Sequence, residues 1–317
     1  MTPHAPARPM LGLVVWSFLA GCGGAPTPEP DPQIEADFLE RRRAIEEEKG
    51  KQTFESDLIN IDKAIDKYAG AWMTSELNAS EKMRDKLDTY LRNMVAKHSD
   101  RLLSLSEQRD YPGNRSIALA ALGFTGRNDV LDALLNGARD DNEQVAVAAL
   151  FGLAILQDPK TPPGVLGDLM NDAKRPADVR RNASLALLRL QEKSFEPEKV
   201  APYWIKVLDR PIEDVDYAVA LHAVRGLGLL RDAANAGCAE RLASHPQPML
   251  RVAAAIAMGR MKSESSVPAL LALLGPGETN ENVRLAARKA LQALAGGIDR
   301  EYDVGEWRKV FERERTK

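Results

Sequence analysis

Residues 250–259 read Leu-Arg-Val-Ala-Ala-Ala-Ile-Ala-Met-Gly, and they contain the pattern that decides the fold: two alanines three residues apart, then an apolar residue. The pattern recurs, with the second alanine of each copy at Ala121, Ala149, Ala186, Ala223, Ala257 and Ala290. The steps between these alanines are 28, 37, 37, 34 and 33 residues. A period in this range is typical of a solenoid of helix pairs, because one pair cannot bury its apolar face alone and must stack on its neighbours.

Shorter apolar helices are expected between the alanine-rich ones, at 130–135, 165–170, 200–208, 236–242 and 267–274. Turn-forming residues such as Arg175-Pro176 separate the two helices of a pair. Alanines three residues apart lie on one helix face, where small side chains let a partner helix approach closely. The sequence therefore predicts an all-α protein: a right-handed α-solenoid of about six helical hairpins over residues 111–297, preceded by an N-terminal helical segment.

The stretches 178–187, 250–259 and 283–291 resemble the second helix of HEAT repeats, particularly the short HEAT-like type first named from phycobilisome lyases. The resemblance covers about residues 112–296, or six repeats. It departs from the pattern in the second and fourth repeats, where Glu143 and Tyr217 replace the usual arginine. It implies a long surface lined by successive second helices, suited to an extended peptide or to the helix of another protein.

The usual arginine stands near the start of the other alanine-rich helices, at Arg115, Arg180, Arg251 and Arg284. A positive charge at a helix start opposes the macrodipole. Each of these arginines is therefore expected to have an acidic or carbonyl partner in the preceding turn or in the neighbouring repeat. The resemblance supports this, because HEAT proteins commonly carry such an Asp and Arg ladder, and we favour this structural role over ligand binding.

Residues 34–110 are polar and rich in helix-forming residues. Spacings of three and four residues predict a heptad-like seam made of Phe54, Leu58, Ile61, Ile65, Tyr68 and Trp72. A second helix is expected to start near Asn78 or Ser80 and to carry Met83, Leu87, Tyr90, Leu91, Met94 and Val95 on one face. The seam is short for a coiled coil between two chains, so we prefer a hairpin packed within one chain.

In the inner repeats, apolar residues beside the alanines, such as Leu119, Val147, Leu221 and Ile256, indicate helices covered on both flanks. The sixth repeat carries Arg288 and other polar residues there, which is typical of a terminal repeat facing water. Residues 298–317 are predicted to form a C-terminal capping helix whose apolar side, with Trp307, folds back over the stack.

An apolar run over residues 10–20 is too short to span a bilayer and suits the core of a signal peptide. It ends in Leu19-Ala20-Gly21-Cys22, which resembles the lipobox of bacterial lipoproteins. The resemblance implies that residues 1–21 are removed, that Cys22 is acylated, and that residues 22–33 form a Gly/Pro-rich tether.

Because Gly23 rather than Asp follows Cys22, the sorting rule of enteric bacteria favours the outer membrane, facing the periplasm. The alternatives are an ordinary signal peptide cut at a small residue and an unprocessed cytosolic start.

A formal net charge of −3 over 317 residues argues against a nucleic-acid partner, which would need clustered Lys and Arg. The chain has four histidines and two cysteines, with no His-Glu-x-x-His pair, cysteine cluster or phosphate loop. We therefore assign no catalytic, cofactor-binding or metal-ligating residue. His222 is expected to be packed or solvated, and Cys238 to be a small buried hydrophobe.

These observations favour a non-catalytic scaffold, anchored by lipid in the bacterial cell envelope, that binds a protein or peptide partner without a cofactor. A second hypothesis is an enzyme or cofactor chaperone resembling the HEAT-like bilin lyases, although those proteins meet their chromophore in the cytosol. A third is a structural envelope protein that oligomerises through residues 34–110.

Overall fold

The computed structural model describes residues 32–73, 77–193 and 197–315, and every regular element in these ranges is a helix. The described residues form two compact units, which meet in sequence between Thr53 and Phe54. In the first unit, the described residues belong to α1 (Pro32–Met73), and nearly all of their described side chains are exposed. The signal peptide, the lipobox residues Leu19, Ala20 and Gly21, and the predicted lipidation site Cys22 lie outside the described residues.

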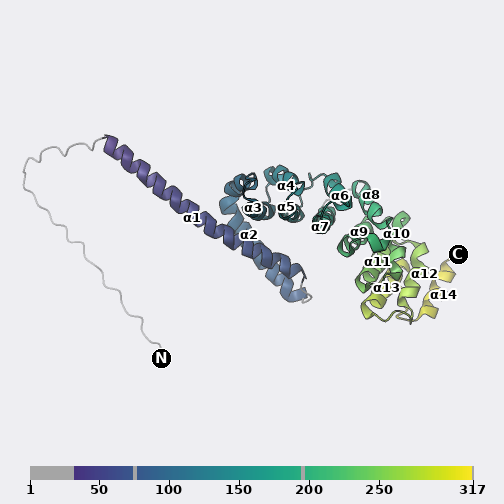
Figure 1. Cartoon of the computed structure of the whole chain (residues 1–317). Coiled ribbons are helices and arrows are strands. Elements are labelled where there is room, and N and C mark those ends of the chain that lie inside the picture. The colour runs from purple at the N-terminus through teal and green to yellow at the C-terminus, as the bar shows by residue number, and fades with distance from the viewer. Residues whose placement is uncertain (1–31, 74–76, 194–196, 316–317) are drawn as a thin grey trace, which may run out of the picture. The chain divides into compact units, whose positions relative to one another are not determined.

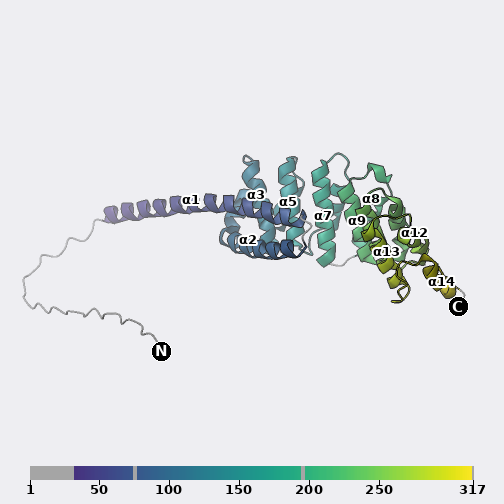
Figure 2. The ribbon, with the colours of Figure 1, turned by 90° about the horizontal axis from the view of Figure 1, so that it is seen from below.

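The second unit is an α-solenoid whose helices alternate between two layers (Figures 1 and 2). One layer holds the alanine helices: α3 (Pro112–Leu122), α5 (Glu143–Leu156), α7 (Ala177–Lys193), α9 (Tyr217–Leu230), α11 (Pro248–Met261) and α13 (Glu281–Leu294). The other holds their partner helices: α2 (Leu77–Ser106), α4 (Leu131–Ala138), α6 (Pro163–Asn171), α8 (Pro197–Leu208), α10 (Ala236–Glu240) and α12 (Val267–Leu274). The predicted all-α solenoid is confirmed.

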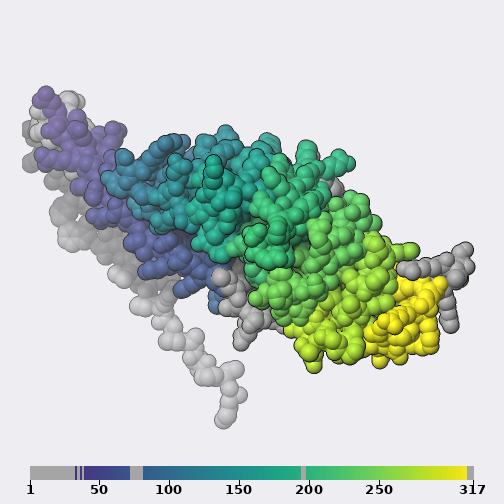
Figure 3. Space-filling view, turned by 45° about the vertical axis from the view of Figure 1, so that its right-hand side comes forward, coloured from purple at the N-terminus to yellow at the C-terminus, as the bar shows by residue number. Residues whose placement is uncertain are grey.

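Short 3-10 helices connect several of these elements, at Gly123–Thr125, Asn128–Val130, Ile212–Asp214, Ala233–Asn235, Arg241–Ser244 and Glu264–Ser266. In the space-filling view the colours from α3 to α14 (Val304–Arg315) follow one another in order along the solenoid, because each repeat packs on its neighbours in sequence (Figure 3). No helix in the described ranges is both long and apolar enough to cross a bilayer.

The alanine pattern marks the surfaces on which neighbouring alanine helices meet. The second alanines of the six copies, from Ala121 to Ala290, are all at most 4% exposed. Glycines add to the close approach: a Cβ built on Gly259 of α11 would lie 2.8 Å from the Cα and Cβ of Ala290 in α13. Small residues therefore set how tightly one repeat stacks on the next.

Side-chain caps fix where several alanine helices begin. Asn142, Asp216 and Asn280 each accept a hydrogen bond from a main-chain N–H in the first turn of α5, α9 and α13. The caps at 142 and 216 start the alanine helices of the second and fourth repeats, in which Glu143 and Tyr217 depart from the usual sequence.

A row of three arginines ties consecutive repeats together on the side of the partner helices. Arg175, Arg210 and Arg241 donate hydrogen bonds of 2.8 to 3.0 Å to main-chain carbonyls at the ends of α4, α6 and α8. Each arginine belongs to the repeat that follows the helix whose end it contacts. The cations complement the negative ends of these helices as well as satisfying their last carbonyls.

The part of α1 that belongs to the second unit packs within the chain. Leu58, Ile61, Ile65 and Tyr68 of the seam are buried, and His98 of α2 lies 2.8 Å from the Asp57 carboxylate. On α2 the face is narrower than predicted, because Met83 and Tyr90 are exposed. Helix α2 also packs on α3 as the partner helix of the first repeat, although the sequence analysis placed it in a separate segment ending at residue 110.

The C-terminal helix α14 packs against α12. Trp307 is fully buried, and its indole N–H donates to the carbonyl of Glu301 at 2.9 Å. Arg288 does not simply face water as predicted: it is half-buried, lies 2.7 Å from the Asp299 carboxylate, and lies over the Tyr302 ring. The polar residues of the last repeat therefore hold the chain that leads into α14.

Candidate functional site

The four predicted arginines all have the kind of partner expected of them. Arg115 pairs with Asp140 of the next repeat and donates to the Ser106 carbonyl at 2.7 Å. Arg251 forms a bidentate ion pair with Glu278 of the next repeat, in which two guanidinium nitrogens lie 2.7 and 2.8 Å from the carboxylate oxygens.

The other two arginines bind carbonyls in the preceding turn. Arg180 donates to the Ala173 carbonyl at 3.4 Å, and Arg284 to the Leu274 carbonyl at 3.2 Å. None of the four arginines lines any of the grooves described below. In the third repeat the ion pair to the next repeat is formed by Arg181, the neighbour of Arg180, which lies 2.7 Å from the Asp216 carboxylate.

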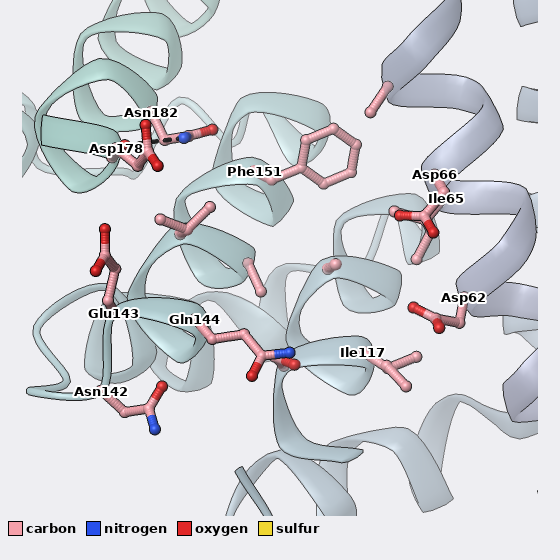
Figure 4. Close-up of a pocket in the computed structure, with 15 residues that line it drawn as sticks. Asp62, Ile65, Asp66, Ile117, Asn142, Glu143, Gln144, Phe151, Asp178 and Asn182 are labelled. Carbon is pink, nitrogen blue, oxygen red and sulfur yellow. Dashed lines mark hydrogen bonds between the residues drawn. The ribbon is translucent and has the colours of Figure 1, made fainter. Parts of the chain in front are cut away.

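A groove of about 890 Å³ opens between α1 and the alanine helices α3, α5 and α7 (Figure 4). One side is the α1 stretch that contains Asp62, Ile65 and Asp66, and the opposite side is formed by the first turns of α5 and α7. The groove therefore runs over the first three repeats.

The bottom of the groove is apolar, with Ile117 of α3 and Val147 and Phe151 of α5 among its lining residues. Phe151 is held by aromatic neighbours: its ring centre lies 6.4 Å from that of Tyr68 in α1 and 6.3 Å from that of Phe124. Tyr68 also meets Phe124 edge to face at 5.3 Å. These contacts pack α1 against α5 and the turn after α3, next to the groove.

The charges that line the groove all have one sign. Asp62 and Asp66 stand on α1, Glu143 and Asp178 stand on the opposite side, and no Lys, Arg or His is among the lining residues (Figure 4). Burial and the nearby Asp66 carboxylate raise the pKa of Asp62 above its ordinary value. The groove thus combines an apolar bottom with an anionic rim.

A second groove, of about 720 Å³, lies between α2 and the alanine helices α7 and α9 and carries both signs of charge. His222 lines it, and its Nδ1 is 2.8 Å from the hydroxyl of Ser184. Burial and then the neighbouring Arg225 lower the pKa of His222 to about 4. Ser184 is fully buried, and its hydroxyl donates to the Arg181 carbonyl. The contact between Ser184 and His222 therefore joins α7 to α9 as part of helix packing.

A third groove, of about 340 Å³, lies on α9 and α11 and has the opposite charge balance. Its exposed apolar residues are Met249 and Ile256, and Arg225 and Arg260 outnumber Glu192 among its charged residues. The expectation that Ile256 is covered on both flanks is wrong, since it is 44% exposed.

Among the described residues, no group of three His, Cys, Asp or Glu side chains is arranged to hold a metal ion. Cys238 is half-buried, with its sulfur 3.7 Å from an Arg241 nitrogen. Burial raises the pKa of its thiol, so the reactive thiolate is disfavoured at neutral pH.

The acidic groove was not predicted from the sequence. Asp62 and Asp66, four residues apart on one helix face, were the available signal, because two like charges at this spacing repel each other. Their proximity to Phe151 and Asp178 depends on where α1 packs, and the helical periodicity of α1 does not encode that position.

Residues 201–292 match a family model for HEAT repeats. No curated protein matches the chain. Among solved structures, a designed armadillo repeat protein is 17% identical, with 61% of this chain and 98% of that chain covered and a TM-score of 0.46.

The phycocyanin lyase complex of a Nostoc species is 19% identical, with 80% of this chain and 94% of that chain covered and a TM-score of 0.38. Human deoxyhypusine hydroxylase is 18% identical, with 76% and 98% covered and a TM-score of 0.35. The described fold is an all-α solenoid of paired helices, and residues 201–292 of it match HEAT repeats. Solenoids of helix pairs offer extended surfaces that typically bind other proteins.

Proposed function

We propose that this chain is a lipid-anchored, non-catalytic scaffold of the bacterial cell envelope, and that it holds a protein partner in the groove between α1 and the alanine helices. The observation that carries this proposal is the groove itself, which is open, about 890 Å³ in volume and lined by residues of three consecutive repeats. A surface of this kind suits a segment of another protein, which can contact several repeats at once.

Two further observations support a scaffold over the alternatives. The residues closest to a nucleophile and base, Ser184 and His222, are used in packing, with the serine fully buried. The seam residues Leu58, Ile61 and Ile65 are covered by this chain's own core, so they do not offer a second copy an apolar stripe.

Site-specific photo-cross-linking in living cells tests the groove. A photoreactive amino acid at Val147, inside the groove, is expected to cross-link one defined envelope protein. The same amino acid at Asp168, exposed on the partner helix α6 and outside the groove, is the matched control. Equal labelling at both positions, or no cross-linked protein at Val147, contradicts the proposal.

The proposed anchor has a separate test. Cys22→Ala is expected to release the protein from the membrane fraction, because the acyl chains supply the membrane affinity. The chain's other cysteine provides the control, since Cys238→Ala leaves the proposed anchor intact. Density-gradient separation of inner and outer membranes tests the proposed outer-membrane location. A Cys22→Ala protein that stays with the membranes as before contradicts the anchor.

A further inference from the structure

We infer that the partner segment that occupies this groove is a basic amphipathic helix, with Lys or Arg along its flanks and an apolar strip facing Val147 and Phe151. The inference rests on the proposed function, and it specifies the chemistry of the partner. Three features of the groove support it: the negative charge of its rim, its apolar bottom, and the helices that surround it.

The rim carries carboxylates that the fold of this chain only partly explains. Glu143 and Asp178 stand in the first turns of α5 and α7, where negative charge stabilises a helix, and Asp178 also pairs with Arg181 at 2.8 Å. Asp62 and Asp66 have no such role, because they lie well inside α1. Across the described residues neither of them forms an ion pair or a side-chain hydrogen bond, and they repel each other.

Both sides of the groove present these charges to the same space. In Figure 4, Asp62 and Asp66 project from α1, and Glu143 and Asp178 lie on the opposite side, with Phe151 between the two sides. A cation placed in the groove therefore meets carboxylates from two directions. A partner with cationic flanks relieves the repulsion between Asp62 and Asp66, whereas an anionic partner increases it.

The apolar bottom and the helical walls favour a helix as the bound segment. Ile117, Val147 and Phe151 offer a strip on which side chains spaced three and four residues apart can pack. The groove is walled by helices, so an extended strand would find no sheet edge to extend. A helix satisfies its own main-chain groups and needs only side-chain contacts.

The third groove, on α9 and α11, is a control for the role of charge within the same molecule. It also combines exposed apolar side chains with charged ones, but Arg225 and Arg260 dominate its rim. A basic helix is repelled there, so neutralising these arginines should not weaken the binding of a basic helix. The two grooves thus provide a site and a control of opposite sign on the same layer of helices.

The test uses two synthetic amphipathic helices with leucines at i, i+3, i+4 and i+7, one with lysine and one with glutamate at the remaining positions. Fluorescence anisotropy with the full chain in detergent is expected to show at least tenfold tighter binding of the lysine peptide. Asp62→Asn with Asp66→Asn should weaken that binding at least tenfold and flatten its salt dependence. Arg225→Gln with Arg260→Gln should leave it unchanged.

The Asn variants are expected to fold, because they remove a repulsion rather than a contact, and an unchanged melting curve verifies this. Equal binding of the two peptides, or an equal effect of the two double variants, overturns the inference. Arg41, Arg42 and Arg43 form an exposed basic cluster on α1 that a second copy of the chain could offer to the groove. A dimer, detected by light scattering, that is broken both by the Asn variants and by reversing the charges of these three arginines also overturns the inference. In that case the occupant is a second copy of this chain.

The two proposals fail in different ways. If cross-linking at Val147 finds no partner, the proposed function fails. If it finds a partner whose cross-linking survives Asp62→Asn with Asp66→Asn, the function stands and the basic-helix inference is wrong.

Discussion

Gly259→Ala tests whether neighbouring alanine helices approach as closely as described. The added methyl group would lie 2.8 Å from the Cα and Cβ of Ala290. Because one of these atoms belongs to the main chain, α13 must shift to make room. Overpacking of this kind costs about 1–3 kcal/mol, and the better helix propensity of alanine returns up to about 1 kcal/mol. We therefore expect a net loss of up to about 2 kcal/mol in the free energy of unfolding, and a difference of about 1–3 kcal/mol from a glycine-to-alanine change without the contact.

Urea denaturation followed by circular dichroism measures this loss, and Gly237→Ala is the control. Gly237 lies inside α10, and a Cβ built on it has no atom within 4 Å outside its immediate neighbours. The control is expected to be neutral or stabilising by up to about 1 kcal/mol, because only the propensity term acts. A Gly259→Ala protein as stable as the Gly237→Ala protein would refute the described contact between α11 and α13.

Three more predictions concern stability. Ala254→Phe should lower the free energy of unfolding by roughly 1–3 kcal/mol, because this alanine is fully buried between helices; unchanged thermal melting would show that the repeat register is misplaced there. Glu278→Gln should cost about 2 kcal/mol at neutral pH. Arg251 holds the Glu278 pKa below its usual value of 4.5. The stabilisation by this ion pair is therefore present above about pH 4.5 and fades as pH falls through the lowered pKa. If Glu278→Gln loses as much stability in acid as at neutral pH, the prediction is wrong. Burial lowers the pKa of His222 to about 4, so only the unfolded chain takes up this proton between about pH 6.5 and 4. Stability should therefore fall over that range, and denaturation at several pH values should show a smaller fall in His222→Gln.

The repeating part of the fold was predictable because its determinants are local. Two alanines three residues apart indicate a helix face that packs closely on a neighbouring helix, and this holds whatever the rest of the chain does. The second alanines from Ala121 to Ala290 are buried, as this rule predicts. The arginine partners were predictable for the same reason, since Arg180 uses a carbonyl in the turn before its helix and Arg284 uses the last carbonyl of the preceding helix α12.

The candidate groove was not predictable, because it depends on contacts between segments far apart in the chain. Asp62 lies 81 residues before Glu143, and the packing of α1 residues such as Ile61 and Tyr68 into the core places both at one groove. Ile256 shows the converse problem. Its helix is apolar nearly all round, so the sequence does not reveal which apolar side chain stays exposed.

Helix α14 has a consequence for how copies of the protein behave toward one another. A stack of similar hairpins ends in an apolar flank that resembles the surface on which each repeat receives the next. Trp307 and Phe311 fill that position at the C-terminal end of this chain. Without them, the open end could be continued by a repeat of another copy, and head-to-tail contacts that do not close into a ring build filaments. The burial of Trp307 and Phe311 therefore removes from solvent the flank on which such a contact would have to form.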